Sequence, residues 1–194
     1  MPEGSMVERV RHLLAERLMG GIRVAQIRWR LAAVLTVLAL DIISKAGARS
    51  WLEGSVSLIP WLLDLVLVYN SGIAFGWLAG GSAFISAAII LIGAMIIVIV
   101  FWQILNPELS RWESMGWSLF LAGAIGNSLE RILLGEVTDF LSFKLYYYPL
   151  FVCNLADVAL TLAVIMLLIH ELFPSWLPSS WRSTAPSIEV QEAE

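Results

Sequence analysis

The sequence predicts an all-helical membrane protein with four transmembrane helices and a small β-sheet at its outer face. Of 194 residues, 59% are apolar and 14% charged, whereas a typical soluble domain has about 45–50% and about 25%. Four apolar segments recur along the chain, and one outer segment alternates like a strand. This composition argues against an ordinary soluble enzyme or a disordered chain. A net charge of −4 without a basic face also excludes nucleic acid as a partner.

The clearest membrane span is residues 82–105, which contain neither a charge nor a proline. A helix needs roughly 20 residues to cross the hydrocarbon core. Three shorter apolar segments are also predicted to span: residues 31–43, 114–129 and 158–169. Each reaches full length only by taking Asp41, Glu130 or Asp157 into the membrane edge. Charges at such positions are costly and are candidates for functional groups.

The distribution of arginine and lysine predicts the orientation. Eight of them fall on one side of the four spans: Arg9, Arg11, Arg17, Arg23, Arg28, Arg30, Arg111 and Arg182. The other side has four: Lys45, Arg49, Arg131 and Lys144. The positive-inside rule therefore places both termini in the cytoplasm and two loops, residues 46–81 and 131–153, outside.

We divide the chain into three parts. Residues 1–28 form a cytoplasmic extension whose apolar residues recur at helical spacing: Val7, Val10, Leu14 and Leu18. This pattern indicates an amphipathic helix on the inner leaflet, although a mobile extension or a later start at Met6 or Met19 explains it equally well. Residues 29–172 form the membrane domain. Residues 173–194, rich in proline and serine, are predicted to be a disordered cytoplasmic tail.

The outer segment at residues 55–76 favours strands over another helix. Its apolar residues alternate with other residues: Val56, Leu58, Leu65, Leu67 and Tyr69. Pro60 and the Asn70-Ser71-Gly72 turn signal bound the two pieces. The pattern predicts a short sheet resting on the membrane surface.

Polar residues gather at the outer membrane edge, and the cytoplasmic edge has no comparable set. The outer set comprises Asp41, Lys45, Asn70, Asn127, Arg131, Asp139, Asn154 and Asp157. If the third and fourth spans pack together, Asp139 and Asp157 meet at one depth. Two poorly solvated carboxyl groups share a proton, so that one takes a proton from water while the other donates to a carbonyl. This is aspartic peptidase chemistry. The alternative is that Asp157 caps its helix and Asp139 pairs with Arg131 or Lys144.

A serine–lysine mechanism has weaker support. Ser44 and Lys45 are adjacent and point in different directions in a helix. Ser142 and Lys144 share a face only if their tyrosine-rich loop is a strand.

Other chemistries are also disfavoured. Cys153, the single cysteine, has no histidine on its side of the membrane and is interpreted as a packing residue. No second histidine completes a zinc motif with His170-Glu171. We therefore expect no metal and no cofactor. A transporter would carry polar residues through the depth of its spans, and a membrane scaffold would tolerate loss of either aspartate.

Four sequence blocks carry a family resemblance. They are DIISK at residues 41–45, NSGIAFG at 70–76, GAIGNSLERILLGEVTDF at 123–140 and NLAD at 154–157. In this order they resemble the lipoprotein signal peptidase family, signal peptidase II, over residues 28–172.

The resemblance implies a specific enzyme. Members are aspartic endopeptidases of the bacterial inner membrane, with four transmembrane helices, an outer-face sheet and a periplasmic helix over the site. They remove signal peptides from prolipoproteins in the phospholipid bilayer, cutting before a cysteine that carries a diacylglyceryl group. Globomycin inhibits them and is expected to inhibit this chain.

By motif position, the resemblance makes Asp139 and Asp157 catalytic. It assigns substrate binding to a set of polar residues: Asn70, Gly72, Asn127, Arg131 and Asn154. Asp41 and Lys45 take a supporting role. Two positions depart from the family pattern. Glu130 stands where aspartate is usual, so the geometry must adjust if this residue orients Arg131, and Cys153 stands where phenylalanine is frequent.

Overall fold

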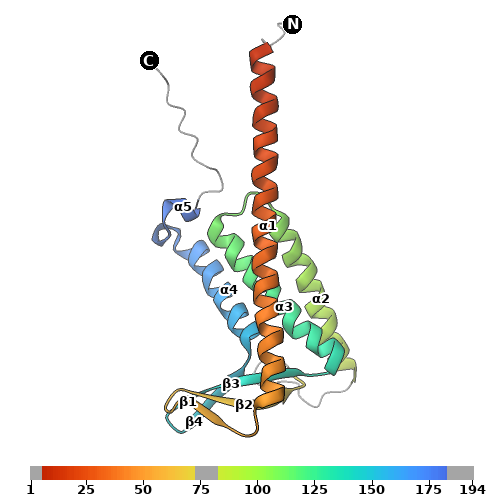
Figure 1. Cartoon of the computed structure of the whole chain (residues 1–194), viewed down its shortest axis with the longest axis vertical. Helices are drawn as coiled ribbons and strands as arrows, with labels where there is room; N and C mark the ends of the chain where they lie inside the picture. Colours follow the sequence, from red (N-terminus) through yellow and green to blue (C-terminus); the bar gives the residue numbers. More distant parts are fainter. Residues whose placement is uncertain (1–5, 73–82, 183–194) are drawn as a thin grey trace.

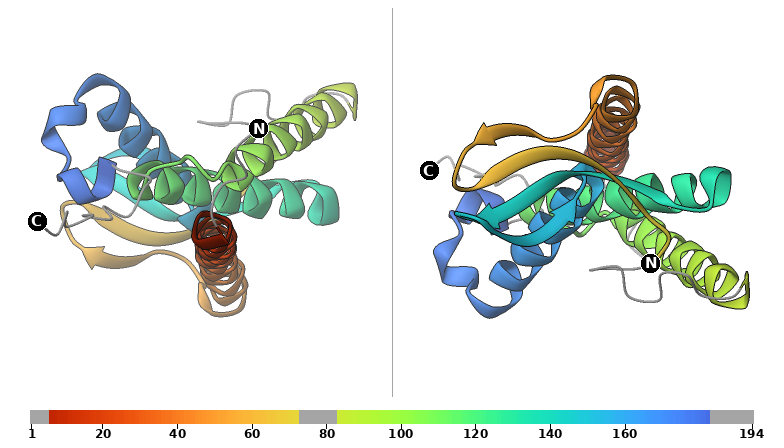
Figure 2. Two further views of the ribbon diagram at one scale, coloured as in Figure 1. Left: turned by 90° about the horizontal axis from the view of Figure 1, so that it is seen from above. Right: turned by 90° about the horizontal axis from the view of Figure 1, so that it is seen from below.

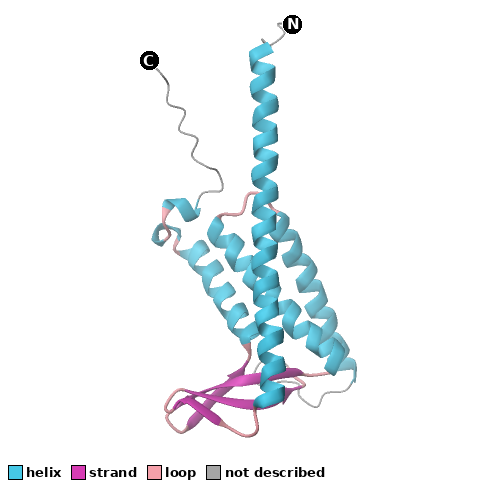
Figure 3. Cartoon of the chain, viewed as in Figure 1, coloured by secondary structure: helices cyan, strands magenta, loops and turns pink. Residues whose placement is uncertain are grey.

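The computed structural model describes residues 6–72 and 83–182, with side chains described from residue 20 onward except at residues 22 and 83. Four long helices lie side by side, and a four-stranded sheet crosses one end of them (Figures 1 and 3). The elements in chain order are α1 (Met6–Trp51), β1 (Val56–Ile59), β2 (Leu63–Asn70), α2 (Ala83–Leu105), α3 (Arg111–Leu134), β3 (Val137–Leu145), β4 (Tyr148–Cys153), α4 (Leu155–Leu172), the 3₁₀ turn η2 (Pro174–Trp176) and α5 (Ser179–Arg182).

Helix α3 is the centre of the bundle and contacts α1, α2 and α4. Two glycines make this possible. A Cβ added at Gly123 would lie 2.5 Å from the carbonyl oxygen of Ala156, and one at Gly126 would lie 2.6 Å from Asp41 Oδ2. Small residues let helix backbones approach closely in a membrane. Gly123 and Gly126 therefore bring α4 and α1 against the polar end of α3.

Three helical segments are long and apolar enough to cross a membrane: Arg23–Trp51, Phe84–Leu105 and Leu155–Leu172. They correspond to the predicted first, second and fourth spans. Helix α3, the predicted third span, lies between them but buries polar side chains such as Ser114 and Glu130. The described part of the chain thus bears out three candidate spans, and the fourth stays a prediction.

The sheet has the order β1-β2-β3-β4 with every neighbouring pair antiparallel. The strands predicted between residues 55 and 70 are confirmed. The second outer loop, predicted at residues 131–153, supplies β3 and β4. Alternation of Val137, Leu141 and Phe143 with more polar neighbours is the signal for β3 that was overlooked. Residues 73–76 of the NSGIAFG block lie outside the described residues. No helix of the described part lies over the site as the resemblance implied.

Local signals set the ends of α3 and α4. Gly135 ends α3 in the left-handed conformation, with φ of 81°, and donates its N–H to the carbonyl of Arg131 at 3.0 Å. Strand β3 can therefore start two residues later, at Val137. A capping box formed by Asn154 and Asp157 begins α4. These turns bring the candidate residues of β3 and α4 to the same end of α3.

The opposite end of the bundle differs from the expected tail. Residues 174–176 and 179–182 form helical turns, so the prediction of disorder is wrong for this part. The physical reason is burial of Leu177, which is 5% exposed, and an edge-on contact between Trp112 and Trp181 at 5.7 Å. Residues 183–194 lie outside the described residues. At the other terminus, α1 runs unbroken from Met6 and extends beyond the bundle (Figure 1). The expected amphipathic face lies on side chains outside the described set.

Candidate active site

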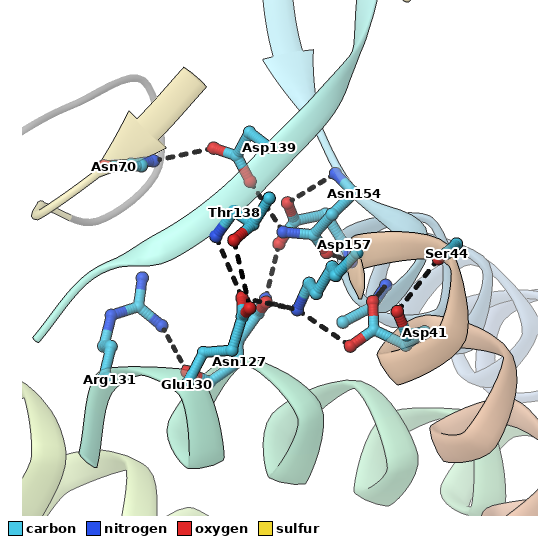
Figure 4. Close-up of polar contacts among 12 residues, drawn as sticks. Asp41, Ser44, Asn70, Asn127, Glu130, Arg131, Thr138, Asp139, Asn154 and Asp157 are labelled. Carbon is cyan, nitrogen blue, oxygen red and sulfur yellow. Dashed lines mark hydrogen bonds and ion pairs between the residues drawn. The ribbon is translucent and has the colours of Figure 1, made fainter. Parts of the chain in front are cut away.

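The polar residues predicted to form a site meet where the sheet crosses the helix ends (Figure 4). They come from five elements and one turn. Asp41 and Lys45 lie on α1, Asn70 ends β2 and Gly72 follows it, Asn127 and Arg131 lie on α3, Asp139 lies on β3, and Asn154 and Asp157 begin α4. One hydrogen-bonded network connects them.

Asp139 is buried, with 3% of its surface exposed, and both carboxylate oxygens accept hydrogen bonds. Oδ1 accepts from Asn154 Nδ2 at 2.6 Å, and Oδ2 accepts from Asn70 Nδ2 at 3.1 Å. Burial raises the pKa of Asp139, and the nearby charge of Asp157 raises it further, against the opposing effect of the two amide bonds. Asp139 is thus a carboxyl group that holds its proton more tightly than an exposed aspartate does.

Asp157 caps α4 and also faces the site. Its Oδ1 accepts from Asn127 Nδ2 at 2.7 Å, and its Oδ2 accepts from the Asn154 backbone N–H at 3.2 Å. The expectation that Asp157 caps its helix is therefore correct, but capping does not exclude the second role. The companion expectation for Asp139 is wrong, because its oxygens bind amides and Lys144 pairs with Asp64 at 2.6 Å.

The three asparagines have their orientation fixed by partners that can only donate. Lys45 Nζ donates to Asn127 Oδ1, the Gly72 N–H to Asn70 Oδ1, and the Asp157 N–H to Asn154 Oδ1, each at 3.0 Å. Since each amide oxygen is taken, each amide NH₂ must turn toward a carboxylate. All four oxygens of the aspartate pair consequently receive a donor.

Lys45 anchors this arrangement from α1, where it is 1% exposed. Its ammonium lies 2.8 Å from Asp41 Oδ2, 3.0 Å from Asn127 Oδ1 and 3.4 Å from Glu130 Oε2. The other Asp41 oxygen accepts from the Ala156 N–H in the first turn of α4 at 2.9 Å. This buried pair therefore connects α1 to both α3 and α4.

Glu130, the first departure from the family pattern, does not bind Arg131. Its Oε2 accepts from the Thr138 N–H at 2.9 Å, and its Oε1 accepts from Thr138 Oγ1 at 3.0 Å and pairs with Arg49. Arg49 also donates to Thr138 Oγ1 at 2.8 Å. Sequence reasoning missed Arg49, which no motif marks, and Thr138, which lies inside the block at residues 123–140 but was assigned no role there. Together with Glu130 they hold β3 immediately beside Asp139.

Arg131 binds backbone carbonyls on two elements. Nη2 donates to the Gly72 carbonyl at 3.0 Å, and Nη1 donates to the Asn127 carbonyl at 3.3 Å. Nε is buried and has no hydrogen-bond partner among the described residues. Arg131 thus ties the turn after β2 to α3, next to the aspartate pair.

A cavity of about 740 Å³ opens from the aspartates between α2, α3, α4 and the sheet. Asp139, Asp157 and Asn127 line its polar end. Its remaining wall is mostly apolar and includes Ile92, Ile96, Phe120, Phe143 and Leu162. An apolar cavity with a few convergent polar groups is the usual form of a ligand site.

The alternative nucleophiles are not equipped for catalysis. Burial, together with the charges of Asp157 and Asp139, raises the pKa of the Cys153 thiol to about 12. Lys144 is paired with Asp64, and the Ser44 hydroxyl donates to its own helix at the Asp41 carbonyl. Within residues 6–72 and 83–182, no group of three or more histidine, cysteine or acidic residues could hold a metal ion.

Comparisons with known proteins agree on one family. The family model described as signal peptidase (SPase) II matches residues 33–173. The chain belongs to the signal peptidase II family. The lipoprotein signal peptidase of Gloeobacter violaceus is 38% identical over 161 residues, covering 82% of this chain and 87% of that protein. That of Thermosynechococcus vestitus is 33% identical over 151 residues, covering 73% and 90%.

Solved structures of membrane enzymes share this fold. A bacterial membrane enzyme determined by the in meso method at 1.9 Å resolution has a TM-score of 0.65 and 26% sequence identity. The match covers 74% of this chain and 92% of that one. The chain is therefore a protease of the membrane, and its family removes signal peptides from prolipoproteins.

Proposed function

We propose that this signal peptidase II is an aspartic endopeptidase that cuts diacylglyceryl-modified prolipoproteins just before the lipid-modified cysteine. Asp139 and Asp157 carry out the catalysis. The observation that carries this proposal is the position of the pair, with all four oxygens held by donors, at the polar end of an apolar cavity. Such preorganised carboxyl groups suit general acid and base catalysis.

Each aspartate has a distinct starting role. Asp139 holds the shared proton, since burial raises its pKa. Asp157 lies at the start of α4, where the helix dipole favours a negative charge. Asp157 removes a proton from water as the water attacks the scissile carbonyl carbon. Asp139 donates its proton to the carbonyl oxygen, giving a neutral tetrahedral diol.

Collapse of the diol completes the hydrolysis. The carbon–nitrogen bond breaks, the amine nitrogen takes the proton that Asp157 had gained, and a diol hydroxyl returns a proton to Asp139. Asn70, Asn127 and Asn154 keep both carboxyl groups in place through their amide donors. This mechanism uses no metal and no cofactor.

The membrane arrangement follows the same proposal. All four helices α1 to α4 span the inner membrane, both termini are cytoplasmic, and the sheet covers the site at the outer face. Support comes from the separation of the two ends of the bundle. Buried Arg30, which donates to the Ile104 and Asn106 carbonyls at 2.8 Å, lies far along α1 from Asp41. The apolar cavity between α2 and α4 then opens at the depth where a lipidated cysteine sits.

A cleavage assay tests the function. Purified protein in detergent receives one prolipoprotein with, and one without, the diacylglyceryl group on its cysteine. We expect cleavage of the lipid-modified form only, and inhibition by globomycin. Equal cleavage of both forms would contradict the proposed substrate, and cleavage of neither by folded protein would contradict the function.

A further inference from the structure

The tips of the two hairpins carry a cluster of exposed aromatic side chains that the catalytic site does not use. This aromatic tip comprises Trp61, Tyr146, Tyr147 and Tyr148, which are 53%, 65%, 94% and 76% exposed. The turn between β1 and β2 lies against the turn between β3 and β4, because the Tyr146 N–H donates to the Trp61 carbonyl at 2.9 Å. The four rings therefore occupy one end of the sheet.

The aromatic tip projects beyond the bundle. The sheet lies across the helix ends, and both hairpins run away from α1 and α2 toward the side of α4 (Figures 1 and 2). The outer surface of α4 has exposed apolar side chains, including Ile165 and Leu168, as expected of a helix that faces lipid. The tip overhangs this same side of the molecule.

The sheet itself has one apolar and one polar face. Cross-strand partners Leu63, Phe143 and Phe151 lie on the apolar face, where the two phenylalanine rings stack at 5.1 Å. Phe143 and Phe151 also line the catalytic cavity. The partners Asp64 and Ser142 lie on the polar face. One continuous apolar surface thus leads from the aspartate pair toward the aromatic tip.

Charge does not oppose placement of the hairpins against lipid. From residue 55 to residue 70 the only charged residue is Asp64, and from residue 141 to residue 153 the only charged residue is Lys144. Asp64 and Lys144 pair with each other at 2.6 Å, each with 17% of its side chain exposed. The hairpin tips therefore carry aromatic and aliphatic side chains and no unpaired charge.

We propose that the aromatic tip enters the headgroup region of the outer leaflet beside α4 and anchors the sheet over the lipid surface. Tryptophan and tyrosine are enriched at this depth because one part of the ring is apolar and another part forms hydrogen bonds. The occupant of this surface is phospholipid, since the tip continues the lipid-facing side of α4. The anchor rests on the membrane arrangement of the proposed function. It holds the cavity mouth at the level where two acyl chains leave the bilayer.

A depth measurement tests the anchor without any catalysis. A Tyr147→Cys variant, labelled at pH 7 with an NBD fluorophore, is placed in phosphatidylcholine and phosphatidylglycerol nanodiscs. Buried Cys153 stays unlabelled, and unsubstituted protein checks this. A matched Ser57→Cys variant carries the label on the exposed polar face of β1. We expect headgroup spin-labelled lipid to remove most of the fluorescence at position 147 and to leave position 57 bright.

Two outcomes would overturn the anchor. Fluorescence at position 147 that survives the spin label would place the tip in water, where a protein partner is the better candidate. Equal quenching at both positions would mean that the sheet is immersed without a specific anchor. Because the measurement needs no substrate, it can succeed even if the cleavage assay fails.

A functional comparison completes the test. The Trp61→Ser/Tyr147→Ser double variant should cleave lipidated substrate more slowly in bilayers, through a higher KM, with kcat unchanged. In detergent micelles it should match the unsubstituted protein. An equal loss in bilayers and micelles would show that these rings support folding, and would contradict the anchor.

Discussion

The guanidinium of Arg131 donates to the carbonyl oxygen of Gly72 at 3.0 Å, and this bond joins α3 to the turn after β2. The Gly72 N–H then holds the Asn70 amide oxygen, and Asn70 donates to Asp139. Arg131 thereby acts on a candidate catalytic carboxyl group through two intermediate residues. The substrate contact expected of Arg131 stays a prediction, and we propose that Arg131 also positions Asp139 through this chain of hydrogen bonds.

Replacing Arg131 with alanine should therefore impair catalysis more than folding. Loss of the charge-assisted hydrogen bond to the Gly72 carbonyl frees this turn, and one such bond contributes about 1.5–3 kcal/mol. We expect kcat/KM to fall by about 10- to 100-fold, with partial rescue in Arg131→Lys. Kinetics and thermal unfolding are measured on the same preparations. Normal kinetics combined with a collapsed melting temperature would contradict this role.

Replacing Lys45 with methionine should destabilise the protein strongly. The substitution leaves the Asp41 and Glu130 carboxylates without their shared cation and frees the Asn127 amide to rotate. Removing one member of a buried pair typically costs about 3–5 kcal/mol. Adding Asp41→Asn should restore part of the melting temperature, because it removes one uncompensated charge. Additive losses in the double variant would argue against coupling between these two side chains.

Glu130 should be better suited to this chain than the aspartate usual in the family. Its longer side chain reaches the Thr138 N–H, the Thr138 hydroxyl and Arg49 together. We expect Glu130→Asp to lose roughly 1–3 kcal/mol of stability, since a shorter carboxylate leaves a buried donor unpaired. Glu136→Asp, a matched change outside this network, serves as the control. Equal melting temperatures for both variants would show that the contacts with Thr138 and Arg49 do not depend on the side-chain length at position 130.

The pH dependence of stability should reveal the buried state of Asp139. Its pKa is raised in the folded protein, so the folded state binds this proton more tightly than the unfolded chain does. The resulting stabilisation is complete below the pKa of an ordinary aspartate and is lost as pH rises through the raised value. The unsubstituted protein should therefore lose stability relative to Asp139→Asn as pH increases. Parallel melting curves for the two proteins across this range would refute the raised pKa.

Much of the site was predictable because polar residues in an apolar chain are conspicuous. Asp41, Lys45, Asn127 and Asp157 lie at the edges of apolar segments, so their gathering at one end of the helix bundle followed from the predicted segment boundaries alone. The capping role of Asp157 was equally readable, because Asn154 precedes it by three residues. The gathering of these residues at one end of the bundle thus needed little tertiary information.

Other features depend on contacts that are distant in sequence. β3 lies in the segment predicted as an outer loop, where Asp139 and Lys144 interrupt the alternation of apolar residues, and its pairing with β2 joins segments far apart in sequence. The network of Arg49, Glu130 and Thr138 joins three elements, and no motif points to Arg49 as the partner of the other two. The turns after α4 form because Leu177 finds a buried position. Local patterns do not contain this information.

The aspartate pair is the central claim, and single-turnover cleavage by Asp139→Asn and Asp157→Asn tests it most directly. Both purified variants receive the lipid-modified prolipoprotein, and thermal unfolding confirms that each is folded. General acid or base catalysis contributes about 10²–10⁴-fold to the rate. The cleavage rate of each variant should therefore fall by a factor of this size. Cleavage near the unsubstituted rate by either folded variant would contradict the account.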